Sequence, residues 1–171
     1  PDDINTWDIV KIVNTVIDHH LKAIENTDSL KSTKLDFYDD ILIKQTNSKK
    51  YRPTLYDFLV HRAVDFFKNS EAGLTKPAGY FKLDKSEYFL TSEIFLQMDL
   101  TTADSLSLKY NALKLLQGLE KFHSTDENPQ SYVDVVLKRL NFVHQNSIHN
   151  EKDSLFVKSL KKLKEKYSDD T

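Results

Sequence analysis

Apolar residues recur every three or four positions through most of the chain, which is the spacing of an amphipathic α-helix. In residues 6–26 they fall on one face, and charged or polar residues fill the other. The same periodicity predicts further helices at about residues 102–123, 129–146 and 150–167. A short polar turn separates the last two, so we expect them to form an antiparallel hairpin.

The segment 54–69 predicts a central buried helix, because apolar side chains surround most of its circumference. Thr54 is expected to begin it, with the acidic residue three positions later completing a capping box. The polar residues of this helix share one narrow stripe when it is wound at 3.6 residues per turn: Asp57, His61, Asp65 and Lys68. We interpret this stripe as the exposed edge of an otherwise buried core helix.

The remaining segments lack a strong period. Residues 26–34 and 45–50 are polar and predict connections, whereas residues 35–43 predict a short helix. Residues 71–85 hold two of the three glycines and form the expected long connection between two helical groups. Residues 86–98 are expected to be partly helical.

Aromatic residues gather between Tyr80 and Phe95. Packing over the core is the favoured interpretation, and an exposed platform on which a sugar or peptide stacks is the alternative. With only three Gly and four Pro in 171 residues, long helices have few interruptions. We therefore expect one all-α domain over residues 1–171, with six or seven helices packed as irregular antiparallel pairs.

Composition narrows the choice of partner. A formal net charge of −2 gives no general attraction to nucleic acid or to anionic membranes, so protein is the expected partner. The sequence contains no run of about 18 apolar residues, so it does not predict insertion into a membrane. The sequence contains no Cys, which excludes disulfides, thiolate metal sites and cysteine nucleophiles. Because it begins with Pro1, we expect it to be a piece of a longer protein.

Candidate chemistry is sparse. Asp57, His61 and Asp65 are spaced four residues apart, so their side chains are weak candidates for a metal site or an acid–base group. The pairs His19–His20 and His144/His149 lack metal-ligand spacing, and the lysines after residue 157 alternate with acids as on a solvated face. The sequence shows no nucleotide-binding or acyl-transfer motif, and we predict no cofactor and no catalytic residue.

The segment Pro53–Phe67, PTLYDFLVHRAVDFF, resembles a stretch in the N-terminal helical region of large bacterial alpha-2-macroglobulin-like proteins. The resemblance implies a cell-envelope or periplasmic protein that entraps proteases, with strings of β-sandwich domains and often a Cys–Gln thioester. This chain has neither the Cys nor a β-sandwich pattern, so the resemblance implies a helical accessory region and transfers no functional residue.

Three functions follow as hypotheses. The first is a non-catalytic helical scaffold or protein-interaction module of such an envelope protein, whose partners include other domains of its own parent chain. The second is a free-standing helical adaptor that binds a peptide or protein in a groove between helices. The third is a metal-dependent enzyme that uses the stripe at Asp57, His61 and Asp65.

Overall fold

The regular elements of the chain are helical throughout the described residues, which are 3–42, 47–68 and 79–168 of a computed structural model. One isolated bridge between Lys34 and Thr54 is the exception. The α-helices are α1 (Ile9–Ala23), α2 (Thr27–Ser32), α3 (Ser48–Tyr51), α4 (Leu55–Phe67), α5 (Ser92–Phe95), α6 (Leu108–His123), α7 (Gln130–Asn146) and α8 (Lys152–Tyr167). The 3-10 turns are η1 (Ile4–Thr6), η2 (Leu35–Tyr38) and η4 (Ser86–Phe89).

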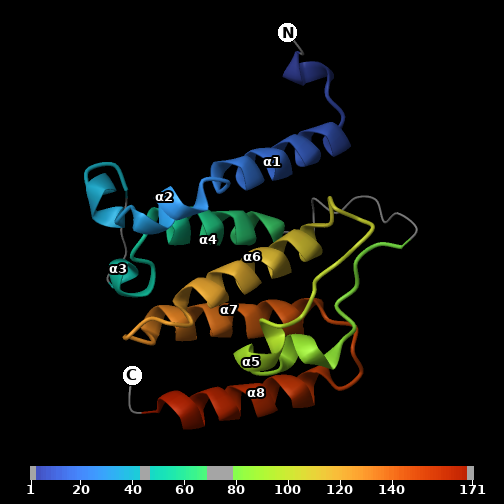
Figure 1. Ribbon diagram of the computed structural model, residues 1–171. Coiled ribbons are helices and arrows are strands. Elements are labelled where there is room, and N and C mark those ends of the chain that lie inside the picture. Colours follow the sequence, from blue (N-terminus) through green and yellow to red (C-terminus); the bar gives the residue numbers. More distant parts are fainter. Residues whose placement is uncertain (1–2, 43–46, 69–78, 169–171) are drawn as a thin grey trace.

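The five long helices lie in successive layers, from α1 through α4, α6 and α7 to α8 (Figure 1). Each runs opposite to the one before it (Figure 1). Short connections join α6 to α7 and α7 to α8, whereas longer segments that contain the short helices and 3-10 turns join α1 to α4 and α4 to α6. This arrangement confirms the predicted all-α fold of antiparallel helical pairs. The described residues contain eight α-helices rather than six or seven, since the additional ones are single short turns.

The start of α4 is fixed by its own side chains. Thr54 Oγ1 accepts from the backbone N–H of Asp57 at 3.2 Å, and Asp57 Oδ2 accepts from the N–H of Thr54 at 2.9 Å. This reciprocal pair is the predicted capping box. Backbone hydrogen bonds from Leu35 to Pro53 and from Leu55 to Thr33, both 2.9 Å, tie the start of α4 to the segment after α2.

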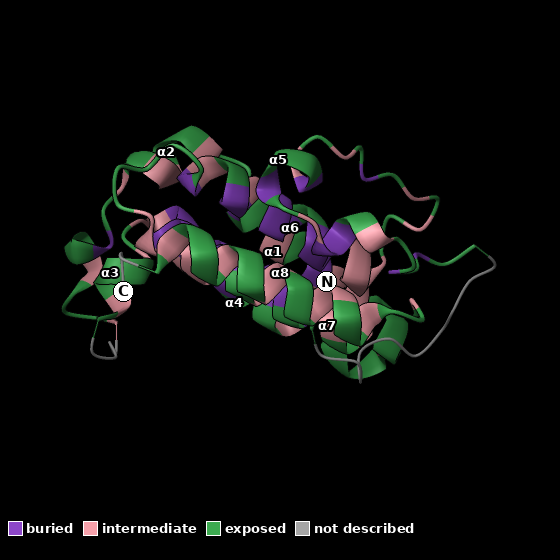
Figure 2. Cartoon of the chain, turned by 90° about the horizontal axis from the view of Figure 1, so that it is seen from below, coloured by how far each residue is buried: buried purple, intermediate pink, exposed green. Residues whose placement is uncertain are grey.

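The core lies between α4, α6 and α7, where apolar side chains from all three helices are buried (Figure 2). Its centre includes Val60, Ala63 and Val64 of α4, Leu113, Leu116 and Leu119 of α6, and Val135 and Val143 of α7. Full burial of one large aliphatic side chain contributes roughly 1.5–3 kcal/mol. By contrast α8 has no buried residue and covers α7 with half-buried ones.

The aromatic segment packs into the core, as favoured from the sequence. Phe81, Tyr88, Phe89 and Phe95 are buried, while Tyr80 is 37% exposed. Arg139 of α7 holds this segment in place: its side chain is fully buried and donates to the carbonyls of Tyr88 at 2.6 Å and Leu90 at 3.1 Å.

The charge of that arginine is balanced inside the protein. Nε of Arg139 donates to Oε2 of Glu120 on α6 at 2.7 Å, and its guanidinium lies 4.3 Å from the ring centroid of Phe95. A buried arginine needs such a partner, because an unpaired charge is costly in a core. Nothing in the pattern of apolar and polar positions indicates this pair.

Several predicted boundaries are wrong. The polar connection at 26–34 contains α2, and the expected helix at 35–43 is only the turn η2 in its described part. The helix expected from residue 102 begins at Leu108, because Ser107 caps it by accepting from Tyr110 N–H at 3.3 Å.

Two predicted connections are only partly described. Ser48 begins α3 within the loop expected at 45–50. Residues 43–46 lie outside the described residues, as do residues 71–78 of the long connection predicted at 71–85. The described remainder of that connection, 79–85, is non-helical. Across the described ranges, no helix combines the length and apolar character needed to span a bilayer.

Candidate functional site between α4 and α7

The polar stripe of α4 is not the exposed edge that the sequence predicts. Asp57 is completely buried and His61 is 2% exposed, whereas Asp65 and Lys68 are on the surface. The interpretation fails because α6 covers one side of this stripe and α7 covers the other, so polar side chains meet polar partners inside the protein. Two different sites result, one at each covering helix.

Asp57 joins α4 to α6. Its Oδ1 accepts a hydrogen bond from Nε2 of His123 at 2.6 Å, and the other ring nitrogen of His123 donates to Oδ2 of Asp126 at 2.6 Å. Burial by itself would lower the pKa of His123, but the hydrogen bonds and charges of Asp57 and Asp126 outweigh it and raise the pKa. His123 is therefore an imidazolium between two carboxylates, with both ring nitrogens paired.

His61 faces α7, one helical turn after Asp57. Nζ of Lys138 lies 3.0 Å from its Nδ1 and 2.9 Å from Oδ1 of Asp65, which also pairs with Lys68 at 3.1 Å. Burial first, and then the charge of Lys138, lowers the pKa of His61 to about 2. The ring is thus neutral; because Nδ1 accepts from the ammonium of Lys138, Nε2 carries the hydrogen.

Two buried polar atoms at this site make no hydrogen bond. Nε2 of His61 and Oδ2 of Asp134 on α7 are buried and have no hydrogen-bond partner among the described residues. They lie 3.9 Å apart, and Nε of Arg52 lies 3.5 Å from the same carboxylate oxygen. An unsatisfied buried donor or acceptor costs roughly 1–3 kcal/mol. A ligand group that accepts from Nε2–H and donates to Asp134 would satisfy both atoms.

A groove of about 350 Å³ opens beside Asp134, between α4 and α7. Its lining consists of Arg52, Asp65, Lys68, Asp134, Leu137, Lys138, Asn141, Phe142 and Gln145. Three cationic and two acidic side chains give the lining a net charge of +1, although the whole chain carries −2. Most of these residues belong to one face of α7, so the groove follows that helix.

The three candidate metal ligands do not converge on one point. Asp57 is hydrogen-bonded to Thr54 and His123, while His61 and Asp65 both contact Lys138 on the opposite side. In the part of the chain that is described, no group of three or more His, Asp or Glu side chains is arranged to hold a metal ion. The third hypothesis therefore lacks a convergent site at this stripe.

The other histidines have structural neighbours. His20 packs against Phe66 and Phe67, and His144 bonds Asp153 at 2.7 Å and stacks on Phe156. The sequence pattern indicates His61 and Asp65 but not the groove residues Arg52, Asp134 and Lys138, because these come from other segments of the chain. The only sequence feature that could have indicated them is weak: Asp134 and Lys138 are charged residues four positions apart on the helix predicted at 129–146.

Comparison of the chain with protein-family models, with curated proteins and with solved structures finds no match. The resemblance of Pro53–Phe67 to macroglobulin-like proteins stays a prediction.

Proposed function

We propose that this chain is a non-catalytic helical module that binds a segment of a partner protein in the groove between α4 and α7. The observation that carries the proposal is the buried Oδ2 of Asp134, a groove residue, which makes no hydrogen bond and lies 3.9 Å from Nε2 of His61, a second buried atom without one. Native proteins satisfy nearly all such atoms, and a bound partner is one way to do so.

A peptide suits this chemistry. Its backbone, or a Ser, Thr, Asn or Gln side chain, offers an acceptor for His61 and a donor for Asp134 within a short distance. Leu137, which is 37% exposed, adds apolar surface to the lining, and the positive net charge of the lining favours a segment rich in Asp or Glu. This corresponds to binding in an inter-helix groove, with α7 as the main contact surface.

Peptide selection from a phage-displayed library tests the proposal. The tightest selected peptide is synthesised with a fluorophore, and its affinity for the full chain is measured by anisotropy. His61→Leu and Asp134→Leu are expected to weaken binding about tenfold or more, as for central residues of an interface. Lys138→Met should weaken it too.

Lys114→Met on α6 is the matched control, because it removes one exposed lysine outside the groove. It should leave the affinity unchanged. Peptides that bind equally well to the His61→Leu and Asp134→Leu variants would contradict the proposal, provided that circular dichroism shows both variants folded.

The resemblance of Pro53–Phe67 supports a narrower form of the proposal. In that form the chain is a helical module of an envelope macroglobulin-like protease-trapping protein, and the bound segment belongs to another domain of the same parent polypeptide. The parent reading frame tests it: downstream β-sandwich segments are expected. A reading frame of single-domain length would favour the free-standing adaptor instead.

A further inference from the structure

The most exposed large apolar side chains of the described residues lie at η2 and just after it. Phe37 is 82% exposed and Ile41 is 75% exposed. Leaving side chains of this size in water forfeits their burial energy, and adjacent exposed apolar residues are typical of contact surfaces. We call residues 36–41 the η2 knob.

The η2 knob is acidic around these two side chains. Asp36, Asp39 and Asp40 belong to it, and Lys49 of α3 forms ion pairs with Asp36 and Asp39. Three carboxylates against one ammonium leave a net charge of −2. A surface that fits this knob therefore needs an exposed apolar patch flanked by positive charge.

The outer face of α8 has that character. A shallow hollow of about 670 Å³ follows it and includes Val157, which is 50% exposed. Its charged lining is Lys158, Lys161 and Lys162 with Asp153 and Glu165, a net charge of +1. We call this the α8 hollow.

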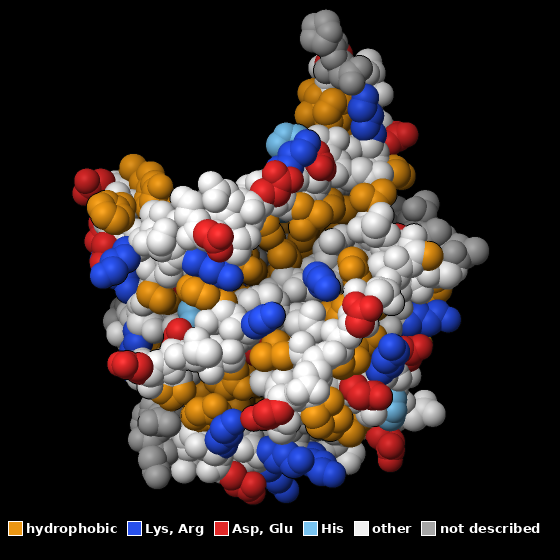
Figure 3. All heavy atoms as spheres, viewed as in Figure 1, with side chains coloured by type: hydrophobic (Ala, Val, Ile, Leu, Met, Phe, Trp, Pro, Cys, Tyr) orange, Lys and Arg blue, Asp and Glu red, His pale blue; other side chains and the backbone are white. Residues whose placement is uncertain are grey.

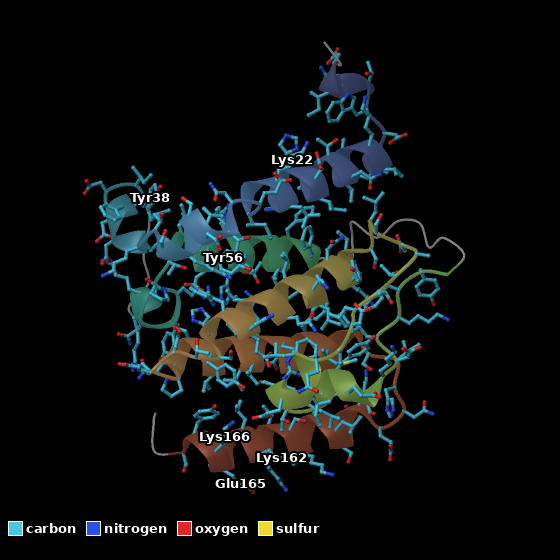
Figure 4. The ribbon with its side chains drawn as sticks, in the orientation of Figure 1. Lys22, Tyr38, Tyr56, Lys162, Glu165 and Lys166 are labelled. Carbon is cyan, nitrogen blue, oxygen red and sulfur yellow. The ribbon has the colours of Figure 1, made fainter. Side chains whose placement is uncertain are left out.

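The knob and the hollow lie at opposite ends of the layered stack. In Figure 4, Tyr38 of η2 marks one corner, and Lys162 and Glu165 mark α8 at the far edge. Figure 3 shows apolar side chains with red carboxylates at the first corner and blue lysines gathered along the α8 edge. One molecule therefore cannot place its own knob in its own hollow.

We propose that the η2 knob of one copy of this chain docks in the α8 hollow of a second copy. Phe37 and Ile41 would cover Val157 and the aliphatic stems of the lysines, and the carboxylates of the knob would lie near their ammonium groups. Because the two surfaces differ, the contact is heterologous, and each copy can bind two neighbours. The product is a ring or an open chain that weakens as salt rises.

Sedimentation velocity of the full chain at increasing concentration, at low and at high ionic strength, tests the contact. The average sedimentation coefficient of the wild type should rise with concentration at low salt, and less at high salt. Phe37→Ser with Ile41→Ser should abolish the rise. Ile4→Ser, which changes a 62% exposed isoleucine outside both surfaces, should leave it intact.

A charge exchange makes the test specific. One variant carries Asp39→Lys and Asp40→Lys, and a second carries Lys158→Glu, Lys161→Glu and Lys162→Glu. Each should be monomeric alone, because its knob and hollow then have the same sign of charge. An equimolar mixture should associate again, because each variant then meets a partner of opposite charge.

Four results would overturn the proposal. The wild type staying monomeric at every concentration at low salt is the first. Association that survives the knob substitutions is the second, and a charge-exchanged mixture that stays monomeric, with both variants folded by circular dichroism, is the third. Loss of association in His61→Leu would assign the contact to the α4–α7 groove and would also overturn it.

Discussion

Two buried histidines lie at α4, one on the helix itself and one packed against it from α6, and the charged groups around them have opposite signs. His123 meets α4 at Asp57 with both ring nitrogens paired to carboxylates, and its pKa is raised. His61, one turn along α4, has an ammonium at one ring nitrogen and no partner at the other, and its pKa is lowered to about 2. The two histidines are equally buried, since each residue is 2% exposed.

The difference lies in the sign of the neighbours. Two carboxylates make the α4–α6 contact an internal ion pair that holds two helices together. At His61, burial and then the charges of Lys138 and Arg52 disfavour the protonated ring, so it stays neutral and keeps an N–H without a hydrogen bond next to Asp134 of the groove. We infer that the first contact serves the fold and that the second is available to a ligand.

The largest effect is expected at the paired histidine. His123→Leu leaves the carboxylate of Asp57 buried without its cation, which should destabilise the chain by about 3–5 kcal/mol. Urea unfolding followed by circular dichroism measures this change. Asp126→Asn, at the exposed end of the same pair, should cost about 1 kcal/mol or less. Equal losses in the two variants would refute the assignment.

The pH dependence of folding separates the two histidines further. His61 has a folded pKa of about 2 against an ordinary 6.5, so between these values the unfolded state binds more protons than the folded state. Stability is therefore complete above pH 6.5 and falls as the pH drops below it. At about pH 5 the loss is about 2 kcal/mol. For His123 the pH dependence of stability has the opposite sign. Its stabilising contribution is complete below pH 6.5 and is lost as the pH rises through its raised pKa.

His61→Leu isolates the first contribution. Unfolding free energies of this variant and of the wild type, compared at about pH 8 and pH 5, should shift by about 2 kcal/mol in favour of the variant at the lower pH. The His61 ring resonances should also stay at their neutral positions over that range. A ring that titrates near its ordinary pKa would contradict both expectations.

The sequence predicts the parts of this site that depend on one helix. Thr54 and Asp57 form their capping box because residues three apart on one segment determine it. The burial of Asp57 and His61 was mispredicted, because it depends on His123, Lys138 and the helices that carry them. A helical wheel cannot distinguish a polar stripe facing water from one facing polar partners. Arg139 and Glu120 were missed for the same reason, since their pairing joins α6 to α7.

A smaller effect is expected when the neutral histidine is replaced near pH 8. His61→Leu gives up one hydrogen bond from Lys138, which keeps Asp65 as a partner, and removes an unpaired buried N–H. The two changes oppose each other, so the cost should be about 1 kcal/mol or less. Urea unfolding beside His123→Leu checks this. A loss as large as that of His123→Leu would make His61 a structural residue and weaken the proposed groove.

The smallest effect concerns the groove charges. Burial is the main reason that the pKa of His61 is low, and the charge of Lys138 comes next, while Lys68 is the last of the contributing charges. Lys138→Met should therefore raise the pKa of His61 without restoring its ordinary value, and Lys68→Met should raise it less. NMR titration of ring-labelled histidines measures both shifts, with Lys114→Met as the control that leaves the pKa of His61 unchanged. If Lys68→Met had the larger effect, Lys138 would not be the ammonium that faces Nδ1, and the N–H would no longer be assigned to the nitrogen beside Asp134.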